Sequence, residues 1–113
     1  MKVKDIVTKL GPEVINKGEH FEDEITSPAC CDLLSIAMAN LPAGCAWVTV
    51  MSNVNTLAVA ALAEVSCVIL ALNTPVSDEF AEKAKKEGIT VLRSAEPIFE
   101  TALAVWNAVR EAE

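Results

Sequence analysis

Apolar positions follow two different periods along this chain, one typical of helices and one typical of buried strands. At the amino end they recur every three or four residues, which places them on one face of a helix. That stripe consists of Val3, Ile6, Val7 and Leu10. Residues 67–72 are apolar at every position, so we expect a strand covered on both faces, as parallel strands between helix layers are.

Helices and strands alternate through most of the predicted order. Helices are predicted at 3–10, 33–39, 55–64, 78–87 and 96–111. Strands are predicted at 14–15, 46–51, 67–72 and 89–92, with an extended segment at 24–32 that is broken at Pro28. Strands that alternate with helices of this length form βαβ units with right-handed crossovers. The pattern therefore predicts an α/β fold with a mostly parallel sheet, and without a linker we expect one domain over residues 1–113.

Residues that start and stop helices agree with these boundaries. Ser77 is a suitable N-cap for the helix at 78–87, and Gly88 is placed to end it. Ser94 is expected to cap the last helix, with Pro97 accommodated in its first turn.

Composition and charge exclude some classes of partner. Of the 113 residues 52% are hydrophobic, and the formal net charge is −7, so phosphate backbones and anionic membrane surfaces repel the chain. Residues 57–72 are almost wholly apolar, but Glu64 interrupts them and a spanning helix needs about 20 apolar residues. The amino end is charged rather than signal-like, so we expect a cytoplasmic protein that binds neither nucleic acid nor membranes.

The motifs of common enzyme classes do not occur. There is no GxxxxGK[ST] or GxGxxG sequence, and His20, the single histidine, lies in a polar loop where we expect it to be solvated. Asp78 and Glu79 suit the first turn of a helix, whereas the carboxylates of residues 22–24 leave a divalent cation open as an alternative. We therefore predict no enzyme activity, no cofactor and no metal site.

The four cysteines are expected to be reduced thiols that pack as small apolar residues. They are Cys30, Cys31, Cys45 and Cys67. The CxxC spacing is missing, and adjacent residues of a strand point to opposite faces, so Cys30 and Cys31 are poorly placed to share a metal. A cysteine-based redox or metal protein stays the third and weakest hypothesis.

Polar residues follow each of the three clear strands. They are Ser52, Asn53, Asn73, Thr74, Arg93 and Ser94. The carboxyl ends of parallel strands meet at one edge of a sheet, next to helix N-termini that favour anions, and Arg93 adds a cation. The sequence therefore predicts a ligand site at this edge, although turns and caps require the same residue types.

Several short motifs, in order, resemble those of one family. Residues 1–7 are similar to its opening helix. The central run of the family consists of acidic, basic and acidic residues, an aliphatic residue and Thr-Gly-Gly, and residues 22–28, Glu-Asp-Glu-Ile-Thr-Ser-Pro, stand in its place. Residues 32–35, Asp-Leu-Leu-Ser, and the segments 47–50 and 55–60 follow in register. In these features the sequence resembles the DRTGG domain family, related to the N-terminal domain of HPr kinase/phosphorylase.

The resemblance implies a three-layer α/β/α fold similar to the N-terminal domains of HPr kinase and MurF-type ligases, and an accessory, regulatory function. It also adds Thr26, Ser27 and Asp32 to the candidate site. Asp23 replaces the basic residue of the motif and Ser27-Pro28 replaces its two glycines. If the motif of the family binds an anion through backbone amides, we expect this copy to have lost that ability, because Pro28 lacks an N–H.

Two functions are carried forward. The first is a non-catalytic regulatory module that senses a small molecule, and the alternative is an interaction or assembly subunit without a ligand. The last helix carries apolar residues on more than one stripe, which indicates that it is buried on two sides. These residues include Phe99, Leu103 and Trp106. We therefore expect a homodimer that forms through this helix.

Overall fold

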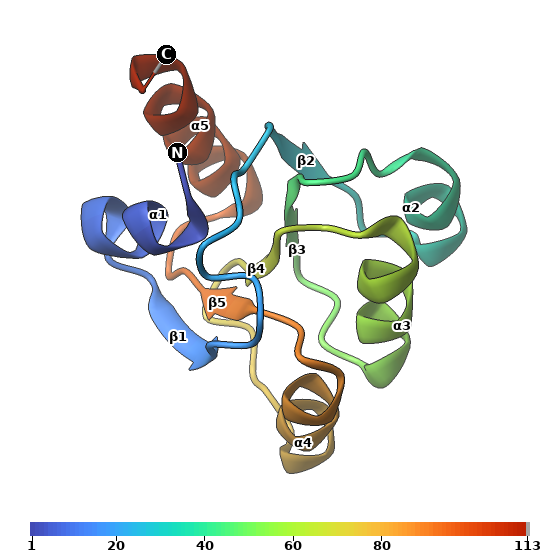
Figure 1. Cartoon of the computed structure of the whole chain (residues 1–113). Coiled ribbons are helices and arrows are strands. Elements are labelled where there is room, and N and C mark those ends of the chain that lie inside the picture. The colour runs from blue at the N-terminus through green and yellow to red at the C-terminus, as the bar shows by residue number, and fades with distance from the viewer. Residues whose placement is uncertain (113) are drawn as a thin grey trace.

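Five strands form one sheet in the computed structural model, which describes residues 1–112 of the chain (Figure 1). They are β1 (Glu13–Asn16), β2 (Pro28–Cys30), β3 (Ala46–Thr49), β4 (Cys67–Leu70) and β5 (Val91–Arg93). Their spatial order is β1-β5-β4-β3-β2. Neighbouring strands from β2 to β5 are parallel, and only β1 runs antiparallel, against β5. The prediction of a mostly parallel sheet is confirmed.

Helices cover both faces of this sheet (Figure 1). One face carries α1 (Val3–Leu10) and α5 (Ile98–Glu111), and the other carries α2 (Leu34–Asn40), α3 (Val54–Ala63) and α4 (Asp78–Glu87). This is the three-layer α/β/α arrangement that the family resemblance implies.

Burial on both faces explains why the central strands do not alternate between apolar and polar residues. In β4, Cys67 and Ile69 belong to the core beneath α1 and α5, whereas Val68 and Leu70 belong to the core beneath α2, α3 and α4. All four residues of β4 are buried. The two cores together require an apolar residue at every position of such a strand.

The ends of two helices test the predicted caps. Ser77 accepts a hydrogen bond from the Phe80 N–H at 3.1 Å and Gly88 ends α4 with φ of +70°, as predicted. The prediction that Ser94 caps the last helix is wrong, because Pro97 occupies the N-cap position of α5. The chain needs three residues after Ser94 to turn from β5 into α5, so its hydroxyl instead accepts from the Glu96 N–H at 3.1 Å.

The chain leaves β4 earlier than its apolar run suggests. Leu72 and Asn73 adopt left-handed conformations, with φ of 57° and 48°, and these reverse its direction. The Asn73 N–H donates to the Ser94 carbonyl at 2.9 Å, which fixes the turn against the segment that follows β5. Two loops at the carboxyl edge of the sheet are thereby held together.

Charge is unevenly distributed along the fold. Residues 33–63, which include α2 and α3, contain no charged side chain, so the net charge of −7 comes from the remainder of the chain.

No helix among residues 1–112 is both long and apolar enough to cross a membrane.

Candidate ligand-binding site

A pocket of about 400 Å³ lies where the carboxyl ends of β4 and β5 meet α1 and α5. Leu10 of α1, Pro12 and Ala104 of α5 contribute accessible apolar surface to its wall, with the buried Ile6 and Val105 behind them. The polar lining residues are Glu13, Asn73, Arg93, Ser94, Glu96 and Thr101. Its volume falls within the range of roughly 300–1,000 Å³ typical of small-molecule sites.

Arg93, the last residue of β5, is the cation of this pocket. Its Nε donates to Oε1 of Glu13 at 3.1 Å, and its Nη2 lies 2.9 Å and 3.1 Å from the two oxygens of the same carboxylate. Its Nη1 donates to the Thr74 carbonyl at 3.2 Å. Glu13 is the cross-strand partner of Arg93 in the antiparallel β1–β5 pair, so the backbone register brings the two side chains together.

The remaining polar groups fix the shape of the pocket. The Ser94 and Thr101 hydroxyls are 3.1 Å apart, and the Thr101 hydroxyl also donates to the Glu96 carbonyl at 3.2 Å. These bonds hold the β5–α5 connection against the first turns of α5. A guanidinium beside an apolar wall can bind a molecule that carries both an anionic group and an apolar portion.

Four of the residues predicted for the site meet at this pocket. Asn73, Arg93 and Ser94 line it, and Thr74 contributes the carbonyl that positions Arg93. They come from two loops that follow adjacent parallel strands, as the rule for the carboxyl edge of such sheets requires.

Three other predicted residues lie along the same edge but are engaged in the fold. The Asp32 carboxylate accepts from the Thr49 hydroxyl at 2.7 Å, and the Ser52 hydroxyl donates at 3.0 Å to a backbone carbonyl of the loop between β4 and α4. The Asn53 side chain accepts from two backbone N–H groups in the first turn of α3. Asn53 therefore caps α3, Ser52 joins two loops, and Asp32 joins the segment after β2 to the end of β3.

The expectation that Thr26 and Ser27 join the site is wrong. Both residues precede β2, which is parallel to β3, so they lie at the amino edge of the sheet and not at its carboxyl edge. The Thr26 N–H donates to the Gly44 carbonyl, and the Ser27 carbonyl accepts from the Ala46 N–H, each at 2.9 Å. In this chain the central family motif ties the start of β2 to the start of β3.

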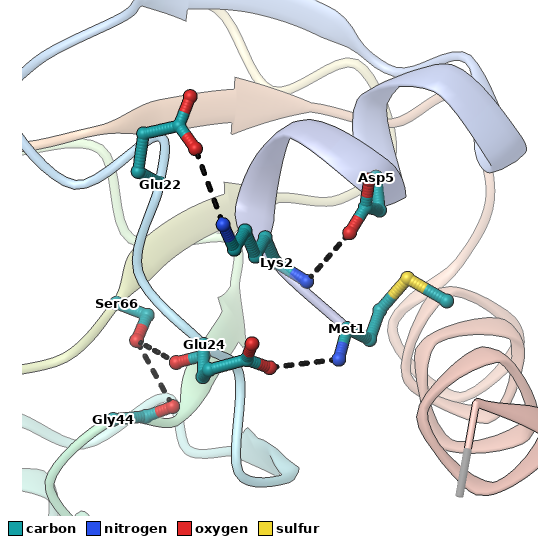
Figure 2. Close-up of polar contacts among 7 residues, drawn as sticks. All are labelled: Met1, Lys2, Asp5, Glu22, Glu24, Gly44 and Ser66. Atoms are coloured by element: carbon teal, nitrogen blue, oxygen red, sulfur yellow. Dashed lines mark hydrogen bonds and ion pairs between the residues drawn. The ribbon is translucent and has the colours of Figure 1, made fainter.

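The acidic loop that precedes this motif is paired with cations at the amino end of the chain, and Figure 2 shows the pairs that involve Met1 and Lys2. Glu24 lies 2.8 Å from the Met1 amino group, and Glu22 lies 3.5 Å from Lys2 Nζ and 3.0 Å from Lys4 Nζ. The hydrogen bond from Lys4 holds the pKa of Glu22 below its usual range. These carboxylates therefore attach the amino end of the chain to the loop.

The other residues considered for metal or catalytic chemistry are dispersed. Nδ1 of His20 lies 2.8 Å from Oδ2 of Asp23 in the same loop. Within residues 1–112, no three His, Cys, Asp or Glu side chains come together as the ligands of a metal ion would.

Sequence reasoning missed Glu13 and Glu96, the two carboxylates of the pocket. Glu13 belongs to a short edge strand, and 80 residues separate it from Arg93. Local periodicity carries no signal for so distant a pairing. The position of Glu96, three residues after β5, would have identified it as a residue of the same edge.

All four cysteines are free thiols, but only two fit the prediction that they are buried. Cys45 and Cys67 are buried, whereas Cys31 is partly exposed and Cys30 is exposed. Cys30 is exposed because it ends β2, the strand at the edge of the sheet. Burial raises the pKa of the Cys45 thiol to about 11 and raises that of Cys67 as well.

These buried thiols predict a loss of stability at alkaline pH. An unfolded thiol ionises near its ordinary pKa of 9.0, below the value of about 11 for folded Cys45. Above about pH 9 the unfolded state therefore holds fewer protons than the folded state, and the free energy of unfolding falls as pH rises towards 11. Urea denaturation across this range should show the decline.

The Cys45→Ala variant is the control for this prediction. Its free energy of unfolding should fall less than that of the wild type over the same pH range, because it lacks one of the two thiols whose pKa is raised. The chain contains no tyrosine, which removes another group that titrates near pH 10. Identical pH dependence in the variant and the wild type would contradict the assignment to Cys45.

The fold and the pocket define a small three-layer α/β/α domain with a ligand-sized cavity at the carboxyl edge of its sheet. The DRTGG domain model matches residues 5–108, so the chain belongs to the DRTGG domain family. The family prediction is confirmed, whereas the relation to HPr kinase stays a prediction. No match is found among curated proteins.

One solved structure resembles the chain closely in fold. It is the crystal structure of the CBS and DRTGG domains of the regulatory region of Clostridium perfringens pyrophosphatase, complexed with its activator, diadenosine tetraphosphate. The TM-score is 0.75 and the sequence identity is 19%, over 92% of this chain and 45% of that one. The chain thus spans less than half of that regulatory region, and the similarity establishes the fold.

Proposed function

We propose that this protein is a non-catalytic regulatory module that binds a small anionic molecule of the nucleotide type in the pocket between α1 and α5. The observation that carries the proposal is the placement of Arg93, a half-buried guanidinium at the carboxyl edge of the sheet beside an apolar wall. A phosphate group would contact the guanidinium, and a base or similar ring would contact Leu10, Pro12 and Ala104. The activator of the pyrophosphatase regulatory region, a dinucleoside polyphosphate, supports this class of ligand.

Thermal unfolding with and without nucleotides tests the proposal. AMP, ATP and diadenosine tetraphosphate are added separately, and at least one should raise the melting temperature. A ligand at a hundredfold excess over its dissociation constant stabilises the folded state by about 2.7 kcal/mol, which corresponds to a shift of several degrees for a domain of this size.

Arg93→Ala should abolish this ligand-dependent shift, because it removes the group that binds phosphate. Lys85→Ala on α4 is the control, since it makes the same change in net charge outside the pocket lining. Equal shifts in wild type and Arg93→Ala would place the site elsewhere, and no shift with any nucleotide would leave the assembly function as the better hypothesis.

A second candidate function, assembly as a homodimer, is favoured by the exposed face of α5. Phe99, Leu103 and Trp106 are 68%, 42% and 44% exposed, and their spacing places them on one stripe. The Arg110 guanidinium stacks on Trp106 at 3.8 Å from the ring centroid. Two such helices packed about a two-fold axis would cover both stripes.

Light scattering tests the dimer, with an expected mass of twice 12.0 kDa at high micromolar concentration. Leu103→Asp should give the monomer mass, because a carboxylate at the centre of an apolar interface is not solvated there. Leu62→Asp is the matched control on the uncharged α2–α3 surface, where Leu62 is 72% exposed. Dissociation by the control alone would assign the interface to α3, and a monomeric wild type would contradict dimerisation.

A further inference from the structure

The guanidinium of Arg93 already binds an anion that belongs to the protein. Each of its three nitrogens is engaged, Nε and Nη2 by the Glu13 carboxylate and Nη1 by the Thr74 carbonyl. A carboxylate in this fork geometry occupies the position that two oxygens of a ligand phosphate would take. The Thr74 carbonyl takes one N–H of Nη1, whereas the Glu13 carboxylate takes the edge formed by Nε and Nη2. A ligand anion that binds this edge with two oxygens must therefore replace its present partner.

Only one of the two partners can leave without disturbing the backbone. The Thr74 carbonyl is fixed by the turn that follows β4, where the Thr74 N–H and hydroxyl both donate to the Ala71 carbonyl, at 3.1 Å and 2.6 Å. The Glu13 side chain is 56% exposed, so rotation about its own bonds can carry the carboxylate into solvent. Glu13 is thus the displaceable partner.

We propose that Glu13 is a built-in competitor for the ligand: its carboxylate occupies the phosphate position of the empty pocket and is displaced when a phosphate-bearing molecule binds. This rests on the proposed function. It explains how a pocket with two carboxylates, in a chain of net charge −7, can accept an anion, since displacement removes one negative charge from Arg93 as another arrives.

Displacement also gives the module a route to a structural response. Glu13 begins β1 and follows α1 through the two residues Gly11 and Pro12, and α1, this connection and Glu13 all line the pocket. Its ion pair with Arg93 joins the antiparallel edge strand to the parallel part of the sheet. Ligand binding would remove that side-chain link and leave the α1–β1 corner attached to β5 by backbone hydrogen bonds.

The test is a calorimetric titration of the full chain with AMP, inorganic phosphate and adenosine as separate probes. Glu13→Gln keeps the size of the side chain but loses the charge that holds it on Arg93. It should bind AMP and phosphate about fivefold more tightly than wild type, the factor expected for loss of one exposed ion pair. Affinity for adenosine, which has no anionic group, should not change.

Glu96→Gln is the matched control, because Glu96 lines the same pocket and no ion pair joins it to Arg93 within residues 1–112. It makes the same change in net charge and should alter AMP affinity by about twofold or less, as expected for a charge not in contact with the anion. Circular dichroism and the melting temperature of each variant establish that it is folded.

The outcomes separate the two proposals. If wild type binds AMP and Glu13→Gln binds it no more tightly than Glu96→Gln does, the competitor role is refuted while the proposed function stands. A fivefold gain for adenosine would also refute it, because Glu13 would then obstruct the pocket and not compete for the anion. If neither wild type nor Glu13→Gln binds AMP or phosphate, the anion site at Arg93 is itself refuted, and the competitor role with it.

Discussion

Gly18→Ala is expected to lower the free energy of unfolding by about 4 kcal/mol, one of the largest effects of any single methyl group added to this chain. A Cβ at Gly18 would lie 2.6 Å from the Gly88 carbonyl oxygen and 2.7 Å from backbone atoms of Ile89 and Thr90. Real Cβ atoms do not approach backbone so closely, and backbone yields less readily than a flexible side chain. The loop would have to separate from the turn between α4 and β5.

That separation would break several bonds at once. The Glu19 N–H donates to the Gly88 carbonyl at 2.9 Å, and the Thr90 hydroxyl donates to the Lys17 carbonyl at 2.7 Å. These bonds fasten the loop after β1 to the start of β5, on which the β1–β5 pairing depends. Urea denaturation followed by circular dichroism measures the loss.

Gly11→Ala is the control, because it shares the backbone conformation without the close contact. Gly11 has φ of +69° and Gly18 has φ of +62°, but a Cβ at Gly11 meets nothing within 4 Å. The left-handed conformation alone should therefore lower the stability of Gly11→Ala by about 1 kcal/mol. Equal losses in the two variants would show that backbone conformation, and not the contact with the α4–β5 turn, determines the effect at Gly18.

Trp47→Ala is the second variant with a large expected effect, a loss of about 3–5 kcal/mol. Trp47 is fully buried in the core beneath α2, α3 and α4, so truncation leaves a cavity the size of an indole ring. Its Nε1–H also donates to the Cys31 carbonyl at 2.9 Å, which fixes the end of β2 against β3. Chemical denaturation followed by circular dichroism is the measurement, because the substitution removes one of the two tryptophans.

Trp47→Phe separates the two contributions. It retains most of the apolar packing and lacks the N–H donor, so it should lose about 1–3 kcal/mol, mainly from the unpaired Cys31 carbonyl. An alanine variant no less stable than the phenylalanine variant would mean that the core closes over the missing ring.

Local sequence signals were sufficient to predict most of the elements. The stripe that begins at Val3 and the apolar run that begins at Cys67 each depend on residues close together in the chain, and so do the caps at Ser77 and Gly88. Boundaries were missed where the backbone turns for reasons outside that pattern. The left-handed turn at Leu72 is an example, because a leucine carries no signal for a positive φ.

Only the residues of the candidate site that follow β4 and β5 were predictable from the sequence. Asn73, Arg93 and Ser94 follow from the rule that parallel strands end at a common edge. Glu13 does not follow from this rule, because it lies on β1, which pairs antiparallel with β5 and is 80 positions from Arg93 in the sequence. The family motif carries no information about the direction of the strand that follows it, and the direction of β2 puts Thr26 and Ser27 at the opposite edge of the sheet.

Both outer strands of the sheet are poorly suited to templating another strand. β2 has three residues and begins with Pro28, which has no N–H to donate, and β1 has four residues with an irregular register between Val14 and Asn16. Long, regular edges are the ones that recruit further strands and start aggregation, whereas short or interrupted edges resist it. The apolar β3 and β4 lie inside these outer strands, so the unpaired backbone groups that another chain could reach belong to short, interrupted edges and not to the most apolar strands of a chain that is 52% hydrophobic.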